Sequence, residues 1–218
     1  MAMREYYNED CMAGMKQYPD KYFDLAIVDP PYGGGGTEFS NNDGTRFGGL
    51  FDKYKQDAVY GKKIIDWDTA PDEAYFNELR RVSKNQIIWG GNYFALPPCR
   101  CFLIWRKLTI SENFTMAMAE YAWTSFKDNA KVFEYAPQGK DRFHPTQKPV
   151  ALYKWILSKY AKQGDIILDT HVGSASSLIA CEELGFDYVG FEIDEEYYKK
   201  SKARLDTFNA QIRLEEFL

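Results

Sequence analysis

The sequence predicts a single α/β domain built on a mostly parallel sheet. Helical and strand patterns alternate from residue 149 to residue 210, and this order is typical of a parallel sheet with right-handed crossovers. Acids follow directly after the strand-like runs, at the position where open α/β sheets bind ligands. The chain has 218 residues, of which 45% are hydrophobic, enough for one well-buried core. It shows no repeat, low-complexity tract or long linker, so we expect one domain over residues 1–218.

The first half of the chain holds most of the predicted strands. Residues 23–28, FDLAIV, are an uninterrupted apolar run and predict a buried strand. A proline near the first turn, acids early and arginines late predict a helix over residues 71–83. Residues 33–66 show no period, and we expect a mobile loop of functional importance there. Further strands are predicted at residues 4–7, 86–91, 101–107 and 118–126.

The second half predicts three helices and two strands. Residues 149–164 place Leu152, Trp155, Ile156 and Tyr160 on one helical face, with a glycine as the stop signal. The next elements along the chain are a strand at 165–169, a helix at 174–185, a strand at 187–194 and a helix at 195–210.

Composition and charge narrow the class of protein. The net charge of −5 argues against nonspecific binding to polyanions, although residues 53–63 and 139–144 are locally basic. No apolar run approaches the roughly 20 residues of a membrane span, and the first ten residues lack the apolar core of a signal peptide. Four cysteines without framework spacing indicate reduced thiols, so we expect a cytoplasmic protein. With only His144 and His171 as histidine ligands, we expect no metal site.

The stretch IVDPPYGGG, residues 27–35, is the first candidate site. Asp29 ends a predicted buried strand, so its carboxylate faces the ligand crevice. Pro30 and Pro31 stiffen the turn and keep free carbonyl acceptors, and Tyr32 adds a flat ring. This set suits a planar group with N–H donors, such as a nucleobase amine.

The stretch ILDTHVGSASS, residues 167–177, is the second candidate site. Gly173 allows a left-handed turn and Ser174 is a candidate cap for the helix that follows. Glu192 ends the next strand, where an acid accepts hydrogen bonds from ribose hydroxyls. The alternative is an ordinary strand-to-helix turn with an unrelated acid nearby. The chain has no GxxxxGK[ST] motif, so a nucleoside ligand without a triphosphate fits better, with Asp169 beside a cationic group.

The stretch FHPTQKP, residues 143–149, is the third candidate site. Its two prolines fix a hydroxyl, an amide and an ammonium, from Thr146, Gln147 and Lys148, which could hold a carboxylate. Taken alone, the stretch is better explained as the start of a helix with a solvated lysine.

Together, in the order DPPY, HPTQKP, ILDTHVGS and GFEID, these stretches resemble the permuted beta class of amino-group DNA methyltransferases. The likeness runs from Asp10 to about residue 208, and it includes WGGNYF, FLIWRK and AEYAWTS, which are similar to small phage and prophage members. The resemblance implies a Rossmann-like S-adenosylmethionine-dependent methyltransferase fold, with helices on both faces of a mostly parallel sheet and one antiparallel strand. An aspartate at the start of the tetrad is similar to the adenine-N6 enzymes.

The resemblance also implies roles for individual residues. Cofactor contacts would come from Asp10 and Cys11 at the adenine, Glu192 at the ribose, Thr146 and Lys148 at the methionine carboxylate, and Asp169, Thr170, His171, Gly173 and Ser174 at the methionine part, with Asp29 bordering the cofactor. The chain departs from the family at Thr170 and His171, where proline and phenylalanine are usual, and at Ala175, where the family has a second glycine.

For the methyl acceptor, the resemblance implies a flipped adenine in double-stranded DNA. Asp29 and the Pro30 carbonyl would accept hydrogen bonds from the amine, and Tyr32 would stack on the base. Phosphate contacts are expected from Lys53, Lys55, Lys62, Lys63 and Arg142. The segment for target recognition is short, about residues 126–143. Cytosine N4, RNA adenine, a protein amide, a catalytically silent regulator, a restriction-modification context and a homodimer stay open.

Overall fold

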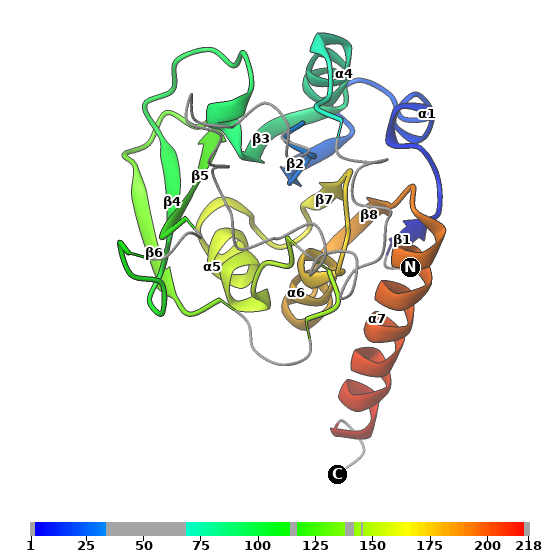
Figure 1. Ribbon diagram of the computed structural model, residues 1–218. Coiled ribbons are helices and arrows are strands. Elements are labelled where there is room, and N and C mark those ends of the chain that lie inside the picture. Colours follow the sequence, from blue (N-terminus) through cyan, green and yellow to red (C-terminus); the bar gives the residue numbers. More distant parts are fainter. Residues whose placement is uncertain (1–2, 34–68, 114–116, 138–141, 145, 216–218) are drawn as a thin grey trace.

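The computed structural model describes residues 3–33, 69–113, 117–137, 142–144 and 146–215, with side chains as far as Gln211. These residues form one eight-stranded sheet in the order β1-β8-β7-β2-β3-β5-β4-β6 (Figure 1). The strands are β1 Arg4–Tyr7, β2 Phe23–Val28, β3 Ser83–Trp89, β4 Phe102–Lys107, β5 Ala119–Thr124, β6 Lys131–Tyr135, β7 Ile166–Asp169 and β8 Asp187–Phe191. Strand β5 runs antiparallel to β3 and β4, and the other paired strands are parallel. The predicted fold class, including its one antiparallel strand, is confirmed.

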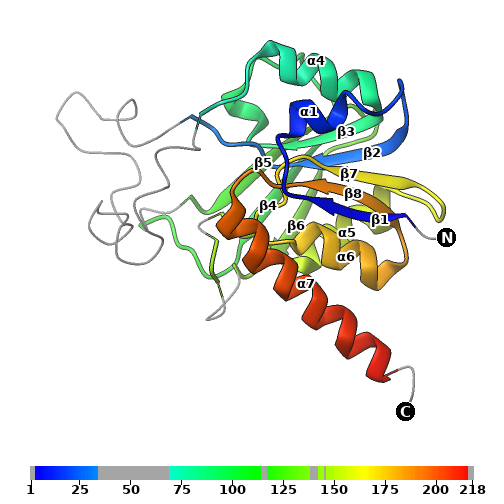
Figure 2. The same cartoon turned by 90° about the vertical axis from the view of Figure 1, so that its right-hand side faces the viewer.

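Helices cover both faces of the sheet. Figure 2 shows α1 Cys11–Met15 and α4 Glu73–Val82 on one side, and α5 Val150–Tyr160 and α6 Ser176–Leu184 on the other. Helix α7, Glu195–Glu215, packs beside α6 and then projects beyond the body of the molecule.

Two apolar cores explain why β2 is apolar at nearly every position. Leu25 and Ile27 point into the core shared with α5 and α6, whereas Ala26 and Val28 point into the core shared with α1 and α4. Successive side chains alternate between the faces of a strand, so a strand that is covered on both sides is apolar throughout.

Three short elements escaped prediction: α1, β6 and the 3₁₀ turn η1, Gly91–Tyr93. Strand β6 is one of the two edge strands of this sheet, and all five of its residues are exposed or half-buried, so it lacks the apolar alternation that marks a strand. It lies within residues 126–143, the predicted target-recognition segment.

The order of the strands places a ligand crevice between β2 and β7. These neighbouring strands are parallel, and the chain leads outward from them in opposite directions, to β3 on one side and to β8 on the other. Such a switch point opens a crevice at the carboxyl ends of the strands. Asp29 follows β2, Asp169 ends β7 and Glu192 follows β8, so the three predicted acids share this edge.

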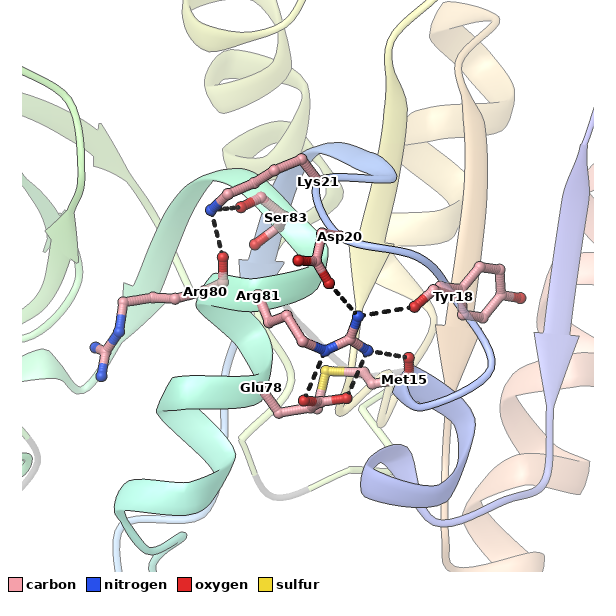
Figure 3. Close-up of polar contacts among 8 residues, drawn as sticks. All are labelled: Met15, Tyr18, Asp20, Lys21, Glu78, Arg80, Arg81 and Ser83. Carbon is pink, nitrogen blue, oxygen red and sulfur yellow. Dashed lines mark hydrogen bonds and ion pairs between the residues drawn. The ribbon is translucent and has the colours of Figure 1, made fainter.

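Arg81 fastens α1 to α4 (Figure 3). Its guanidinium donates to both carboxylate oxygens of Glu78, at 2.9 and 2.7 Å, and to Asp20 at 2.8 Å. It also donates to the carbonyls of Tyr18, at 3.0 Å, and Met15, at 3.2 Å. The carbonyl of Met15, at the end of α1, also accepts the backbone N–H of Tyr18 at 3.1 Å, and with the Arg81 contact it fixes the end of the short helix that begins with Cys11.

Candidate active site

Asp29 lies at the centre of a packed polar group. The Tyr32 hydroxyl donates to one carboxylate oxygen at 2.7 Å, and the Lys148 ammonium pairs with the other. The Tyr32 ring stacks on Tyr93 with 4.8 Å between centroids. Burial is the largest effect on Asp29 and raises the pKa of its carboxyl, while the charge of Lys148 opposes that rise. The DPPY stretch therefore brings a buried acid and an aromatic ring together.

Lys148 is buried between two carboxylates. Its ammonium contacts Asp29 and also lies 3.1 Å from a carboxylate oxygen of Glu120, with the Trp89 ring at 5.3 Å. The alternative of a solvated lysine is wrong, because Lys148 is only 3% exposed. Sequence reasoning missed Glu120, which lies in the AEYAWTS stretch on β5.

Asp169 is buried at the end of β7. One carboxylate oxygen accepts the hydroxyl proton of Ser177, and the other accepts the backbone N–H of His171 at 3.0 Å. Burial raises the pKa of Asp169 to about 7, despite these two hydrogen bonds. A buried acid that titrates near neutrality is poised to respond to a cationic group.

The two residues after Asp169 are tied to α4. The hydroxyls of Tyr75 and Thr170 lie 2.7 Å apart, and the Thr170 hydroxyl lies 2.9 Å from Nδ1 of His171. Burial lowers the pKa of His171 to about 4, so its ring is neutral at physiological pH. Tyr75 was not predicted, and its hydroxyl anchors Thr170 to α4.

The turn before α6 is left-handed at two positions. Gly173 has φ 55°, as predicted, and Ala175 has φ 60°. The prediction that Ser174 caps α6 is wrong. The N-cap residue is Ala175, which has no side-chain acceptor for the backbone N–H groups of the first turn. The Ser174 hydroxyl instead lies 3.1 Å from that of Ser176.

Glu192 closes this turn from β8. One carboxylate oxygen accepts the backbone N–H of Gly173 at 2.8 Å, and the other accepts that of Asp194 at 2.9 Å. The side-chain amide of Asn8 donates to the Glu192 carbonyl at 2.8 Å. Burial raises the pKa of Glu192.

The remaining predicted residues line the same edge or fall outside the described ranges. Asp10 caps α1 by accepting the backbone N–H of Ala13 at 3.0 Å, and Cys11 is buried behind it. Thr146 Oγ1 lies 3.1 Å from His144 Nδ1, and Arg142 donates to the His144 carbonyl at 3.0 Å. The predicted loop and its lysines Lys53, Lys55, Lys62 and Lys63 lie outside the described residues.

Within the described ranges, no cluster of three or more histidine, cysteine, aspartate or glutamate side chains could hold a metal ion. Among the helices that the structure describes, none is both long enough and apolar enough to cross a membrane.

This mostly parallel sheet, with acids after β2 and β8 and at the end of β7, has the fold of a solved methyltransferase complex with S-adenosylmethionine. A family model described as DNA methylase matches residues 104–203. This match to DNA methylases of the N6/N4 type covers a little under half of the chain.

Curated relatives are similar over different spans. The chain is 40% identical to the type II methyltransferase M.HpaI of Haemophilus parainfluenzae over 74 residues, which is 34% of this chain and 24% of that protein. It is 24% identical to the putative methylase YubD of Escherichia coli (strain K12) over 227 residues, which is 93% of this chain and 90% of YubD.

Solved structures share the fold. The complex of M1.HpyAVI with S-adenosylmethionine matches with a TM-score of 0.58 at 21% identity, covering 92% of this chain and 98% of that one. The cytosine-N4-specific PvuII DNA methyltransferase matches with a TM-score of 0.56 at 11% identity, covering 94% of this chain and 89% of that one.

Proposed function

We propose that this protein transfers a methyl group from S-adenosylmethionine to the N6 amino group of a flipped adenine in double-stranded DNA. The observation that carries the proposal is the placing of Asp29 beside Asp169 and Glu192, on the carboxyl edge of neighbouring strands. Asp169 and Glu192 lie at β7 and β8, where we place the cofactor. Asp29 follows β2 in the DPPY stretch, where we place the acceptor base.

The residues around Asp169 fit the cofactor. Glu192 carries the acceptors for the ribose hydroxyls, and its hydrogen bond to Gly173 holds the turn close to them. With a pKa of about 7, Asp169 is only partly ionised at neutral pH, and a cation beside it favours the charged form. Asp10 and Cys11 at the start of α1 border the adenine, and Thr146 borders the methionine carboxylate. When bound, the cofactor supplies a methyl group that its sulfonium already activates.

The residues around Asp29 orient the acceptor amine. The Asp29 carboxylate accepts one N–H of the amine and the Pro30 carbonyl accepts the other, which makes the nitrogen lone pair available for in-line transfer. Positioning of this kind supplies several kcal/mol. The base stacks on Tyr32, which returns about 1–3 kcal/mol of the cost of flipping.

Adenine is preferred to cytosine because the tetrad begins with aspartate, as in the adenine-N6 enzymes. The likeness to PvuII methyltransferase, at 11% identity, concerns the fold and does not favour cytosine. Lys53, Lys55, Lys62, Lys63 and Arg142 are proposed as phosphate contacts that position the duplex.

The class of acceptor is tested by incubating the protein with tritiated S-adenosylmethionine and, separately, double-stranded DNA, RNA or a protein extract. We expect label in DNA, and no label with the Asp29→Asn variant. Transfer to RNA or protein in preference to DNA would overturn the proposal.

A further inference from the structure

Four charged side chains alternate in sign in a line that ends at the candidate active site. Lys107 Nζ lies 2.7 Å from one oxygen of Glu120, and Lys148 Nζ lies 3.1 Å from the other. Lys148 in turn pairs with Asp29. The line joins β4, β5, the segment before α5 and the end of β2, so four separate parts of the chain build it.

The two lysines lie deep in the protein, and the carboxylates are nearer the surface. The side chain of Lys148 is 2% exposed and that of Lys107 is 7% exposed, against 11% for Asp29 and 26% for Glu120. A buried ammonium requires a charged partner, and Asp29 alone would provide one for Lys148. Glu120 adds a second carboxylate, and Lys107 balances its charge. Lys148 therefore has one carboxylate partner more than it needs to balance its buried charge, and the two partners together fix the position of its ammonium.

The position of Lys148 decides which lone pairs Asp29 can offer. A carboxylate has about four acceptor positions on two oxygens. Tyr32 already donates to one Asp29 oxygen and Lys148 to the other. An ammonium paired with Asp29 alone would be free to bridge both oxygens and compete with the amine. An ammonium that Glu120 also holds stays at one side of the carboxylate.

We propose that Glu120, braced by Lys107, is a positioning residue for methyl transfer: it holds Lys148 at one side of Asp29 and so leaves acceptor positions open for the substrate amine. This inference rests on the proposed function. It assigns no contact between Glu120 and the substrate.

Glu120→Gln tests the inference, because glutamine keeps the shape and removes the charge. We expect kcat on DNA to fall by about ten- to a hundredfold, as for loss of a hydrogen bond between charged groups. The Kd for S-adenosylmethionine is expected to change less than kcat, because Lys148 keeps its charge and its pairing with Asp29. Glu183→Gln is the matched control: Glu183 pairs with Lys154 between α6 and α5, both side chains are well exposed, and neither lies in the predicted target-recognition segment. It should keep the wild-type kcat.

Lys107→Met gives a second variant that leaves both partners of Lys148 in place. We expect a smaller fall in kcat than for Glu120→Gln, and no further fall when the two changes are combined, because Lys107 acts through Glu120. Additive losses would overturn the positioning role of the Glu120–Lys107 pair.

Chemical labelling of Lys148 tests whether Glu120 holds its ammonium, and it does not depend on any activity measurement. Acetylation of its amine by acetic anhydride, followed by mass spectrometry, should be faster in Glu120→Gln than in the wild type or Glu183→Gln, because the ammonium has lost a carboxylate partner. Equal labelling rates would overturn the inference, and so would a wild-type kcat in Glu120→Gln, while the proposed function would stand. A wild type that transfers no methyl group to any DNA would instead overturn the proposed function.

Discussion

Replacing Asp169 by asparagine should make the protein more stable and at the same time weaken its cofactor binding. Asparagine has the same shape, its amide oxygen can accept the N–H of His171, and its amide nitrogen can donate to the Ser177 hydroxyl. The substitution therefore keeps both hydrogen-bond partners and removes only the titration.

The size of the effect follows from the pKa. Burial raises the pKa of Asp169 from 3.8 to about 7 in the folded protein. At about 1.36 kcal/mol per pKa unit, this difference corresponds to at most about 4 kcal/mol. Between pH 3.8 and about 7 the folded protein binds the proton more tightly than the unfolded chain does. Titration of Asp169 therefore lowers the stability of the wild type as the pH rises through this window. The variant lacks this contribution.

Urea denaturation of the cofactor-free protein, at intervals from pH 4 to pH 8, measures this difference. The free energies of unfolding of wild type and Asp169→Asn should be close near pH 4 and should diverge in favour of the variant towards pH 8. Asp24→Asn is a control of opposite sign, because pairing with Lys84 and a hydrogen bond from the Ile166 backbone lower the pKa of Asp24. That variant should be less stable than the wild type at pH 7.

The same variant should bind S-adenosylmethionine more weakly by calorimetry, since it cannot offer a negative charge to a cation. Parallel pH profiles for wild type and Asp169→Asn, or a variant less stable than the wild type at pH 8, would refute the reasoning. Asp169 would then be an ordinary ionised carboxylate.

Four further predictions concern single residues. Asp29→Asn should lower methyl transfer by about a hundredfold or more, as expected for loss of a preorganised polar group, with an unchanged Kd for S-adenosylmethionine in calorimetry. Glu192→Gln should weaken that Kd by about ten- to a hundredfold, because the ribose loses a charged acceptor; an unchanged value would place the ribose elsewhere. Ala175→Gly should raise the free energy of unfolding by about 0.5–1 kcal/mol in urea titrations, because alanine at φ 60° is strained, and a loss of stability would contradict this. Arg81→Lys should lower it by about 1–2 kcal/mol, since lysine cannot supply the five donated hydrogen bonds; a wild-type urea midpoint would show that the cluster contributes nothing.

The fold was predictable where burial imposes a pattern. Strand β2 is covered on both faces, so its sequence is apolar throughout, and Asp29 at its end marks the edge of the sheet. Strand β6 has no fully buried residue, so its sequence carries no apolar pattern and the strand was not predicted. Helix α1 is only five residues long, too short for an apolar period to be seen.

The site was predictable at residues that belong to contiguous motifs, and less so at their partners. Asp29, Asp169 and Glu192 each follow or end a strand and were found from that position alone. Glu120, Lys107 and Tyr75 reach the site across the sheet or from a packed helix. Contacts between distant parts of the chain leave no spacing that a single sequence reveals.

The most direct test of the central claim is the identity of the methylated base. Unmethylated double-stranded DNA is incubated with the protein and S-adenosylmethionine, digested to nucleosides and analysed by liquid chromatography and mass spectrometry. We predict N6-methyladenine with the wild type and none with Asp29→Asn. N4-methylcytosine in its place would contradict the choice of adenine, and unmodified DNA would contradict the proposed activity.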